Sequence, residues 1–269
     1  MDEKKIQKID RQIEQFSIRN KDADDYKVRG DVFDNATLKI LYKFANKGVI
    51  TAMGGVISTG KEANVFHAIG QEDEELAIKI YRLATSNFKA MQDYLLGDPR
   101  FSSIKTDKRS IIFAWTKKEF RNLKRSCEVG IPAPFPIASE KNILIMKFIG
   151  KDGVGAPRLK DIGPDLCEPE ANFDKISGYV VDLYNKAGLV HGDLSEFNIL
   201  YMDEPILIDM GQAVTLDHPM AEEFLRRDIK NLIRFFKKLG VKCDEEEVIK
   251  RVKAKNSATE SVPLYENDS

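Results

Sequence analysis

The spacing of hydrophobic positions changes several times along the chain, and each change predicts a different element. Near the start, apolar residues recur among charged ones at three- and four-residue steps, the period of an amphipathic helix. These residues are Ile6, Ile9, Ile13 and Phe16. A second helix is predicted over residues 35–46, because its apolar positions share one face and Gly48 follows its end. We therefore expect residues 1–48 to form an N-terminal helical extension.

Residues 49–149 contain short apolar runs bounded by polar residues and glycines, a pattern typical of strands. The runs that predict strands are 49–52, 55–57, 64–68, 76–81 and 142–148. A helix is predicted from about Phe113 to Glu128, and prolines predict a turn over 132–136. Residues 82–110 are polar and poorly periodic, so they predict a long mobile loop. This part of the chain should form a small, mainly antiparallel lobe with one helix.

Residues 150–257 have a mainly helical pattern, after a connection as far as Pro157 that predicts a hinge. One apolar stripe predicts a helix that ends at Gly188, and its members are Ile176, Tyr179, Val180, Leu183, Tyr184 and Ala187. Two short strands are predicted at 199–201 and 206–208, followed by two helices, and residues 258–269 are expected to fray. The whole pattern predicts an α+β fold of two lobes, one β-rich and one mainly helical.

Composition narrows the possible functions. The 269 residues carry 42 Lys and Arg against 43 Asp and Glu, which excludes a uniformly basic nucleic-acid coat. Apolar runs such as 111–115 are far shorter than the roughly 20 residues of a membrane helix. No apolar leader follows the charged first residues, so we expect a cytoplasmic protein without a membrane partner. The three cysteines are widely spaced, which argues against a zinc site or a disulfide framework.

The strongest chemical signal is the segment His191-Gly192-Asp193-Leu194-Ser195-Glu196-Phe197-Asn198, placed between a predicted helix and a predicted strand. Asp193 is a candidate general base that accepts a proton from an attacking hydroxyl. Asn198 and Asp209 offer the oxygen ligands that Mg²⁺ prefers, and phosphoryl transfer needs this combination. Each of the three alone is more simply explained as a turn or cap residue, and only their conjunction favours catalysis. His191 is expected to be a scaffold residue.

A second half of a site lies upstream. Lys79 is flanked by apolar residues in a predicted strand, so its ammonium would be costly to bury without an anion. Glu119, on the helix from Phe113, is the candidate partner, although its charged neighbours also fit a solvated helix face. A nucleotide phosphate would serve Lys79 equally well.

The turn at 58–65 precedes Lys79 at the interval expected of a hairpin that covers phosphates. Gly55, Gly60 and Lys61 match the beginning of a P-loop pattern, but Glu62 stands where a metal-binding hydroxyl is required. Predicted strands also flank the turn on both sides. We therefore reject a P-loop NTPase.

Taken together, these residues resemble the protein-kinase fold, and in particular the RIO family of atypical serine/threonine protein kinases, over about residues 48–255. The resemblance implies ATP and Mg²⁺ as cofactors, with Mn²⁺ a plausible substitute. It makes Asp193 the catalytic base and gives Asp209 a catalytic and a metal-binding role beside Asn198. Met146 falls at the gatekeeper position, and the backbone of 147–149 should bond adenine. The implied nucleotide-binding residues are Ser58, Thr59, Gly60, Lys61, Glu62, Ala63, Val65, Lys79, Glu119, Met146, Phe148 and Ile149.

The same resemblance implies autophosphorylation on serine or threonine, an ATPase switch with a phosphoaspartate at Asp209, and a role on a small ribosomal subunit precursor. Candidate self-phosphorylation sites are Ser86, Ser102, Ser103 and Ser110. About ten residues separate Asp209 from a helix near Met220, and no A-P-E motif follows. The activation segment and peptide-docking helices of ordinary protein kinases therefore have no room.

Two alternatives remain at this stage. A small-molecule phosphotransferase of the aminoglycoside or choline kinase kind also uses an H-G-D-x-x-x-x-N loop, but the loop over 58–63 favours the RIO family. A non-turnover assembly factor would instead contact RNA phosphates through basic clusters, with steep salt dependence. Those clusters are Lys117-Lys118-Arg121-Lys124-Arg125, Arg226-Arg227-Lys230 and Lys250-Arg251-Lys253-Lys255, although the acids between them fit solvated faces better.

Overall fold

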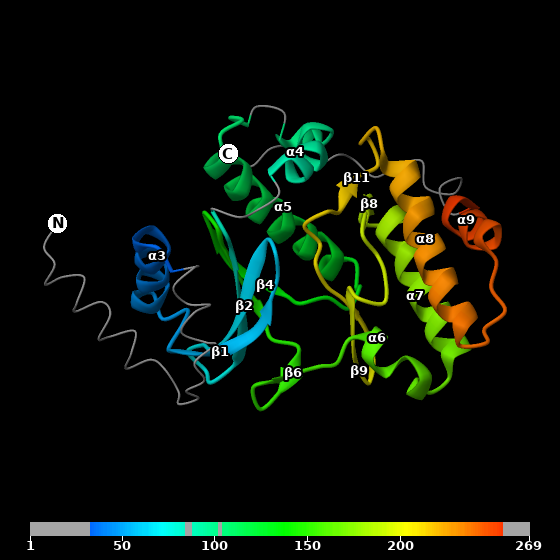
Figure 1. Ribbon diagram of the computed structural model, residues 1–269, viewed down its shortest axis with the longest axis horizontal. Coiled ribbons are helices and arrows are strands. Elements are labelled where there is room, and N and C mark those ends of the chain that lie inside the picture. Colours follow the sequence, from blue (N-terminus) through cyan, green and yellow to red (C-terminus); the bar gives the residue numbers. More distant parts are fainter. Residues whose placement is uncertain (1–32, 84–87, 102–103, 255–269) are drawn as a thin grey trace, which may run out of the picture.

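A computed structural model describes residues 33–83, 88–101 and 104–254 of the chain. The helix expected within the first thirty residues and the tail at 258–269 lie outside these ranges. The described residues form two lobes, one built on a sheet and one mainly of helices, as the sequence predicts (Figure 1). No helix in this described part combines the length and apolar composition needed to cross a membrane.

The smaller lobe is built on a five-stranded antiparallel sheet in the order β1-β2-β3-β5-β4. Its strands are β1 (Ala52–Thr59), β2 (Ala63–Ile69), β3 (Glu75–Tyr81), β4 (Pro136–Glu140) and β5 (Ile143–Lys147). The two strands expected at 49–52 and 55–57 are in fact the single strand β1, which is irregular at two points where its register with β2 shifts. β4 replaces part of the turn that the prolines predicted, because Pro136 stands at the edge of the sheet, where its missing N–H is tolerated.

One face of this sheet is covered by α3 (Asn35–Asn46), which begins at the N-cap Asp34 (Figure 1). Ile40, Leu41 and Phe44 of α3 belong to the same buried cluster as Phe66 and Ile78 of the sheet. A buried amide joins the two layers, since Asn142 Nδ2 donates to Thr37 Oγ1 at 3.1 Å and to Tyr81 O at 3.1 Å. The lobe core therefore depends on α3.

The expectation of a long loop over residues 82–110 is wrong. This stretch contains α4 (Phe88–Leu96), the 3₁₀ turn η1 (Pro99–Phe101) and the beginning of α5 (Lys108–Glu128). Met91, Leu95 and Phe101 are buried in a cluster with Trp115 of α5. Their helical spacing was obscured by the breakers Gly97 and Pro99 that follow. α5 begins five residues before the predicted start, at the N-cap Asp107.

The connection between the lobes forms a short hairpin of β6 (Gly150–Lys151) and β7 (Val154–Gly155), where a hinge was expected. The larger lobe follows with α6 (Leu159–Ile162), η2 (Gly163–Asp165) and α7 (Pro169–Asn185). Its remaining elements are β8 (Leu189–Val190), β9 (Ile199–Met202), β10 (Glu204–Leu207), β11 (Val214–Thr215), α8 (Ala221–Lys238) and α9 (Glu245–Ala254). Asp244 caps the beginning of α9, because Asp244 Oδ1 accepts from Glu247 N–H at 3.1 Å.

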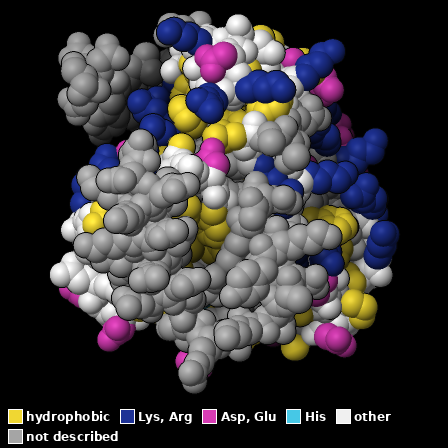
Figure 2. Space-filling model, turned by 60° about the vertical axis from the view of Figure 1, so that its left-hand side comes forward, with side chains coloured by type: hydrophobic (Ala, Val, Ile, Leu, Met, Phe, Trp, Pro, Cys, Tyr) yellow, Lys and Arg dark blue, Asp and Glu magenta, His cyan; other side chains and the backbone are white. Residues whose placement is uncertain are grey.

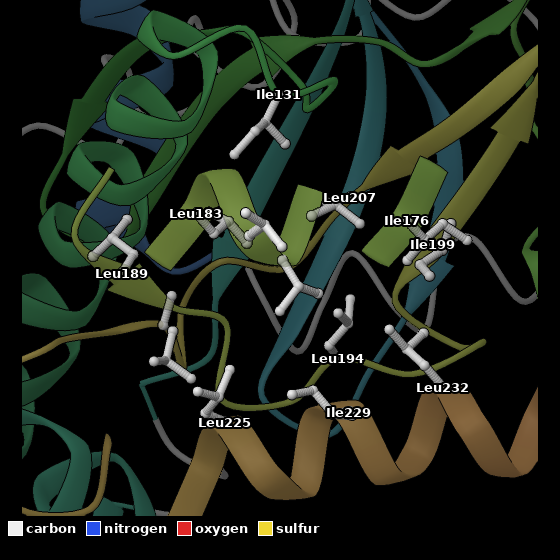
Figure 3. Packing of buried hydrophobic residues seen from close by; sticks show 14 of the residues in the cluster. Ile131, Ile176, Leu183, Leu189, Leu194, Ile199, Leu207, Leu225, Ile229 and Leu232 are labelled. Atoms are coloured by element: carbon white, nitrogen blue, oxygen red, sulfur yellow. The ribbon is translucent and has the colours of Figure 1, made fainter. Parts of the chain in front are cut away.

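The core of the larger lobe lies between α7 and α8 and is filled by aliphatic side chains (Figure 3). Ile176 and Leu183 of α7 and Leu225, Ile229 and Leu232 of α8 line it. The loop between β8 and β9 contributes Leu194, which is fully buried among them. The polar residues on either side of Leu194 are therefore held by a packed side chain.

Candidate active site

A cavity of about 1000 Å³ lies where the lobes meet. This volume suits a nucleotide-sized ligand. Every nucleotide-binding and metal-binding residue predicted from the sequence lines it, and Asp193 alone among the predicted residues does not. The lining residues from the predicted set are Ser58, Thr59, Gly60, Lys61, Glu62, Ala63, Val65, Lys79, Glu119, Met146, Phe148, Ile149, Asn198 and Asp209.

Lys79 is the charged centre of the cavity. It projects from β3 and is 8% exposed. Its Nζ donates to Glu119 Oε1 at 2.7 Å and to Asp209 Oδ1 at 2.9 Å. Burial opposes the charged ammonium, but Asp209 and Glu119 hold the pKa of Lys79 well above its usual value. The cation therefore joins β3, α5 and the loop after β10 in one ion-paired group.

Tyr81 supports this group and was not found from the sequence. Its hydroxyl donates to Glu119 Oε2, and the ring lies 5.2 Å from Lys79 Nζ. Tyr81 follows Lys79 by two residues on the same strand, so both side chains lie on one face of the sheet. That period-two spacing was the available signal. Glu119 is thus held from both sides, and its side chain is 1% exposed.

The turn between β1 and β2 is tight, because only residues 60–62 separate the strands. Gly60 N–H donates to Ala63 O at 2.9 Å, and Glu62 O accepts from Arg82 N–H at 2.9 Å. A Cβ at residue 60 would lie 3.0 Å from Ala63 O, so glycine suits the turn. Burial, and next the charge of Asp209, raises the pKa of Glu62. Strands flank the turn, which agrees with the rejection of a P-loop.

The end of β5 and the two residues that follow it form the wall expected to face adenine. Lys147 N–H donates to Phe135 O at 2.8 Å, and Phe148 N–H donates to Glu75 O at 3.1 Å. Both amides are therefore committed, although the sequence predicted that 147–149 as a group would bond the base. Within the described part of the chain, Ile149 N–H makes no backbone hydrogen bond, and it is the amide left to meet a ligand.

Asp193 lies in the loop between β8 and β9 and does not itself line the cavity. Its Oδ2 accepts from Asn198 Nδ2 at 3.0 Å and from Gln212 Nε2 at 3.2 Å. Burial raises the pKa of Asp193, and the nearby Asp209 carboxylate adds to the effect. A carboxylate with a raised pKa is a better proton acceptor near neutral pH. The arrangement fits a general base.

Two residues of α8 hold this loop, and neither role was predicted from the sequence. Asp228 accepts from Gly192 N–H and Leu194 N–H, each at 2.8 Å, and Arg227 Nη2 donates to Gly192 O. Burial raises the pKa of Asp228 to about 7. The signal was an acid inside the apolar stripe of α8, at a position that the helical period assigns to the core.

His191 is buried and does not itself line the cavity. Its Nε2 lies 3.1 Å from Ile208 O, and burial lowers its pKa to about 4. A neutral ring next to a carbonyl must carry its proton on Nε2 to bond it. His191 therefore ties the loop to the strand segment that leads to Asp209, which agrees with the scaffold role expected from the sequence.

Asp209 occupies a left-handed backbone conformation, with φ of 62°. Such strain in a non-glycine residue is typical of functional positions. Although burial would raise the pKa of Asp209, the Lys79 ammonium lowers it below its usual value, so the carboxylate stays ionised. Within the described part of the chain, the side-chain hydrogen bonds of Asn198 both use Nδ2, to Asp193 O and Oδ2, which leaves Asn198 Oδ1 to a ligand. This oxygen pair fits a divalent cation such as Mg²⁺.

The position of Lys118 contradicts part of the basic surface predicted from the sequence. It was expected on an exposed basic cluster, yet it is fully buried and donates to Gly211 O at 2.8 Å. Burial lowers its pKa to about 7. Other members of the predicted clusters are paired with acids: Arg226 with Glu222 and Glu246, Arg251 with Asp174, and Lys253 with Glu222. Lys and Arg side chains gather along one margin of the face in Figure 2, with Asp and Glu side chains interspersed. Lys255 lies outside the described residues.

Of the predicted self-phosphorylation sites, only Ser110 lies within the described residues. Ser86, Ser102 and Ser103 lie outside the described residues. Ser110 lies in the first turn of α5, where its Oγ donates to Asp107 Oδ2 at 2.6 Å. That contact belongs to the cap of the helix.

Comparison with known proteins decides the family. Residues 64–248 match the family model described as the RIO domain. This chain belongs to the RIO family. Among curated relatives, the RIO-type serine/threonine-protein kinase Rio1 of Haloferax volcanii is 48% identical, over 87% of this chain and 80% of the relative. The protein of the same name from Methanocaldococcus jannaschii is 40% identical, over 95% of this chain and 88% of the relative.

A longer relative shows the same match. Human serine/threonine-protein kinase RIO1 is 40% identical over 88% of this chain, but the match spans only 42% of the human protein. Among solved structures, the Rio2 kinase–ADP/Mg²⁺–phosphoaspartate complex from Chaetomium thermophilum has a TM-score of 0.60 at 23% identity. It covers 82% of this chain and 70% of the solved chain. This likeness confirms the two-lobed kinase-like fold of the RIO family.

Proposed function

We propose that this chain is an ATP- and Mg²⁺-dependent RIO-type serine/threonine protein kinase. The observation that carries the proposal is the contact of Lys79 with both Glu119 and Asp209 in a nucleotide-sized cavity that Asn198 also lines. Lysine, carboxylates and an amide oxygen are the groups that position and neutralise a triphosphate. The names of the Rio1 relatives support the same reading.

Each residue has a separate task in this proposal. Asp193 accepts the proton of the attacking hydroxyl, and Lys79 binds phosphate oxygens. Glu119 and Tyr81 hold Lys79 in place, while Ile149 N–H and the neighbouring backbone orient adenine. Asn198 and Asp209 would hold Mg²⁺, which supplies positive charge to the phosphate oxygens. Transfer then depends mainly on alignment and charge neutralisation.

We propose that the chain phosphorylates itself on serine or threonine. We further propose that it also hydrolyses ATP as a switch through a phosphoaspartate at Asp209, in maturation of the small ribosomal subunit. The solved Rio2 complex holds ADP, Mg²⁺ and a phosphoaspartate, which supports the second step by analogy. A protein acceptor is favoured over a small molecule because the relatives are named as protein kinases.

The test is phosphate transfer from labelled ATP by the purified chain, in parallel with D193A and D209A. We expect each variant to lose about 10²–10⁴-fold in turnover, the contribution of one acid–base group or more. Transfer by D193A at the wild-type rate would remove Asp193 as the base. Small hydroxylated acceptors serve as the competing arm, and faster turnover on them than on the chain itself would make it a small-molecule phosphotransferase.

A further inference from the structure

The turn that carries Asp209 is held from outside its own lobe, by α5. We use "the Asp209 turn" for residues 209–213. Gly211 O accepts from Lys118 Nζ at 2.8 Å. Asn122 Nδ2 donates twice, to Met210 O at 2.9 Å and to Ala213 O at 2.8 Å. Three carbonyl groups of the turn thus bond to two side chains of one helix.

These two side chains are fully buried and share one face of α5. Lys118 and Asn122 are four residues apart, the spacing at which helical side chains are neighbours. Trp115, three residues before Lys118, packs so closely that a Cβ at Gly211 would lie 2.7 Å from its Nε1. The rings of Trp115 and Tyr94 lie 5.1 and 5.9 Å from Lys118 Nζ. A buried ammonium is costly unless a polar group meets it. Lys118 meets this need through a carbonyl of the Asp209 turn, so the helix and the turn are held together at this point.

The orientation of the Asn122 amide is fixed by a second pair. Arg100 Nη1 donates to Asn122 Oδ1 at 3.0 Å, and Arg100 is itself bound by both carboxylate oxygens of the buried Asp98. If the amide were turned over, its NH₂ would face the guanidinium and its oxygen would face two carbonyls. Arg100 therefore commits both Asn122 donors to the turn.

The same helix reaches Asp209 by another route. Glu119 pairs with Lys79, which donates to the Asp209 carboxylate. α5 thus contacts the side chain of Asp209 through Lys79 and its following backbone through Lys118 and Asn122. We propose that Lys118 and Asn122, with Arg100 behind them, are positioning residues that set the direction of the Asp209 carboxylate toward the metal. This inference rests on the proposed function of Asp209.

Three variants test the inference against one matched control. N122A removes two donors, K118M removes one while keeping the length of the side chain, and R100M leaves both donors but frees the amide to turn. K117M makes the same chemical change as K118M at the adjacent, exposed position of α5. Folding is checked by circular dichroism, and R100M decides if either core variant does not fold.

The first readout needs no nucleotide. Hydrogen exchange of the free protein is expected to rise at residues 209–213 in the three variants and to stay unchanged in K117M and in α7. A general loss of stability would raise exchange in α7 as well. Unchanged exchange in the turn, or a rise of equal size throughout, would overturn the inference.

The second readout is direct binding of Mn²⁺ in the presence of ADP, measured by electron paramagnetic resonance of the free ion. N122A and K118M are expected to bind Mn²⁺ about 10–100-fold more weakly, as when the support of a metal ligand is removed. R100M should show a smaller change in the same direction. Equal Mn²⁺ affinity in all variants would overturn the inference, whereas absent binding by the wild-type protein would overturn the proposed function instead.

Discussion

The two walls of the cavity hold their functional side chains by different means. On the small-lobe wall, Lys79 is fixed by opposite charges at 2.7 and 2.9 Å. On the large-lobe wall, the loop of Asp193 is fixed by backbone amides that donate to Asp228 and by the buried Leu194 (Figure 3). A buried charge depends on its partner, whereas a bonded backbone keeps its path when a side chain in the site changes. The small-lobe wall should therefore respond most strongly to changes of charge.

Among these variants, removal of the Lys79 charge should lower the free energy of unfolding the most. K79M leaves Glu119 buried without its cation, and we expect the free energy of unfolding to fall by about 3–5 kcal/mol. The double variant K79M/E119Q should recover most of this loss while phosphate transfer stays abolished. Urea denaturation measures the first quantity and labelled ATP the second. K147M, at an exposed lysine of the same cavity, is the control. Wild-type stability of K79M would contradict the contrast.

The matching change on the other wall is D228A. It leaves the amides of Gly192 and Leu194 without their acceptor, which should lower the free energy of unfolding by about 1–3 kcal/mol. Turnover should fall because the Asp193 loop loses its support, while nucleotide affinity changes little. Urea denaturation and equilibrium binding of labelled ADP separate these effects. A large loss of ADP affinity with an unchanged turnover would show that the loop does not depend on Asp228.

The pH dependence of stability sharpens the comparison further. Burial raises the pKa of Asp228 from its usual 3.8 to about 7 in the folded protein, so the folded state binds this proton more tightly than the unfolded one. This group therefore favours folding below pH 3.8, and its contribution is lost as the pH rises to about 7. Above that pH it is constant. D228N lacks this titration. The unfolding free energy of the wild type minus that of D228N should therefore fall as the pH rises from 3.8 to about 7. A constant difference would contradict the assignment.

The smallest effect is expected for an ion pair in solvent. Lys43 of α3 donates to both carboxylate oxygens of Glu140 at 2.8 and 2.7 Å, a distance close to that of the Lys79 pair. Its side chain is 50% exposed, so we expect K43A to cost about 0.2–1 kcal/mol in unfolding free energy. Urea denaturation beside K79M compares two pairs that differ mainly in burial. Equal losses would show that burial does not govern these pairs.

The sequence predicted the elements with clear periods and the residues with distinctive chemistry. Lys79, Glu119, Asn198 and Asp209 were predicted as site residues, because a lysine in an apolar strand and metal-type ligands are visible in the sequence alone, and the structure places all four in the lining of one cavity. The helix at 35–46 was predicted with its limits.

The remainder depends on contacts that a single segment does not reveal. Lys118 looks like part of a basic surface until Gly211, 93 residues later, is known to lie against it. α4 was missed because the breakers Gly97 and Pro99 follow it and because its partner Trp115 lies on another helix. The role of Asp228 is likewise visible only in the structure, where its carboxylate accepts from two amides of the loop between β8 and β9.

The position of α3 determines where a stable fragment of this protein can begin. The matched domain begins at residue 64, inside β2, so a fragment with those limits would lack α3 and β1. Its sheet would lose an edge strand and expose Phe66 and Ile78 to water. Such a fragment would be prone to aggregate during expression. A useful truncation should begin before Asp34, whose carboxylate starts the helix.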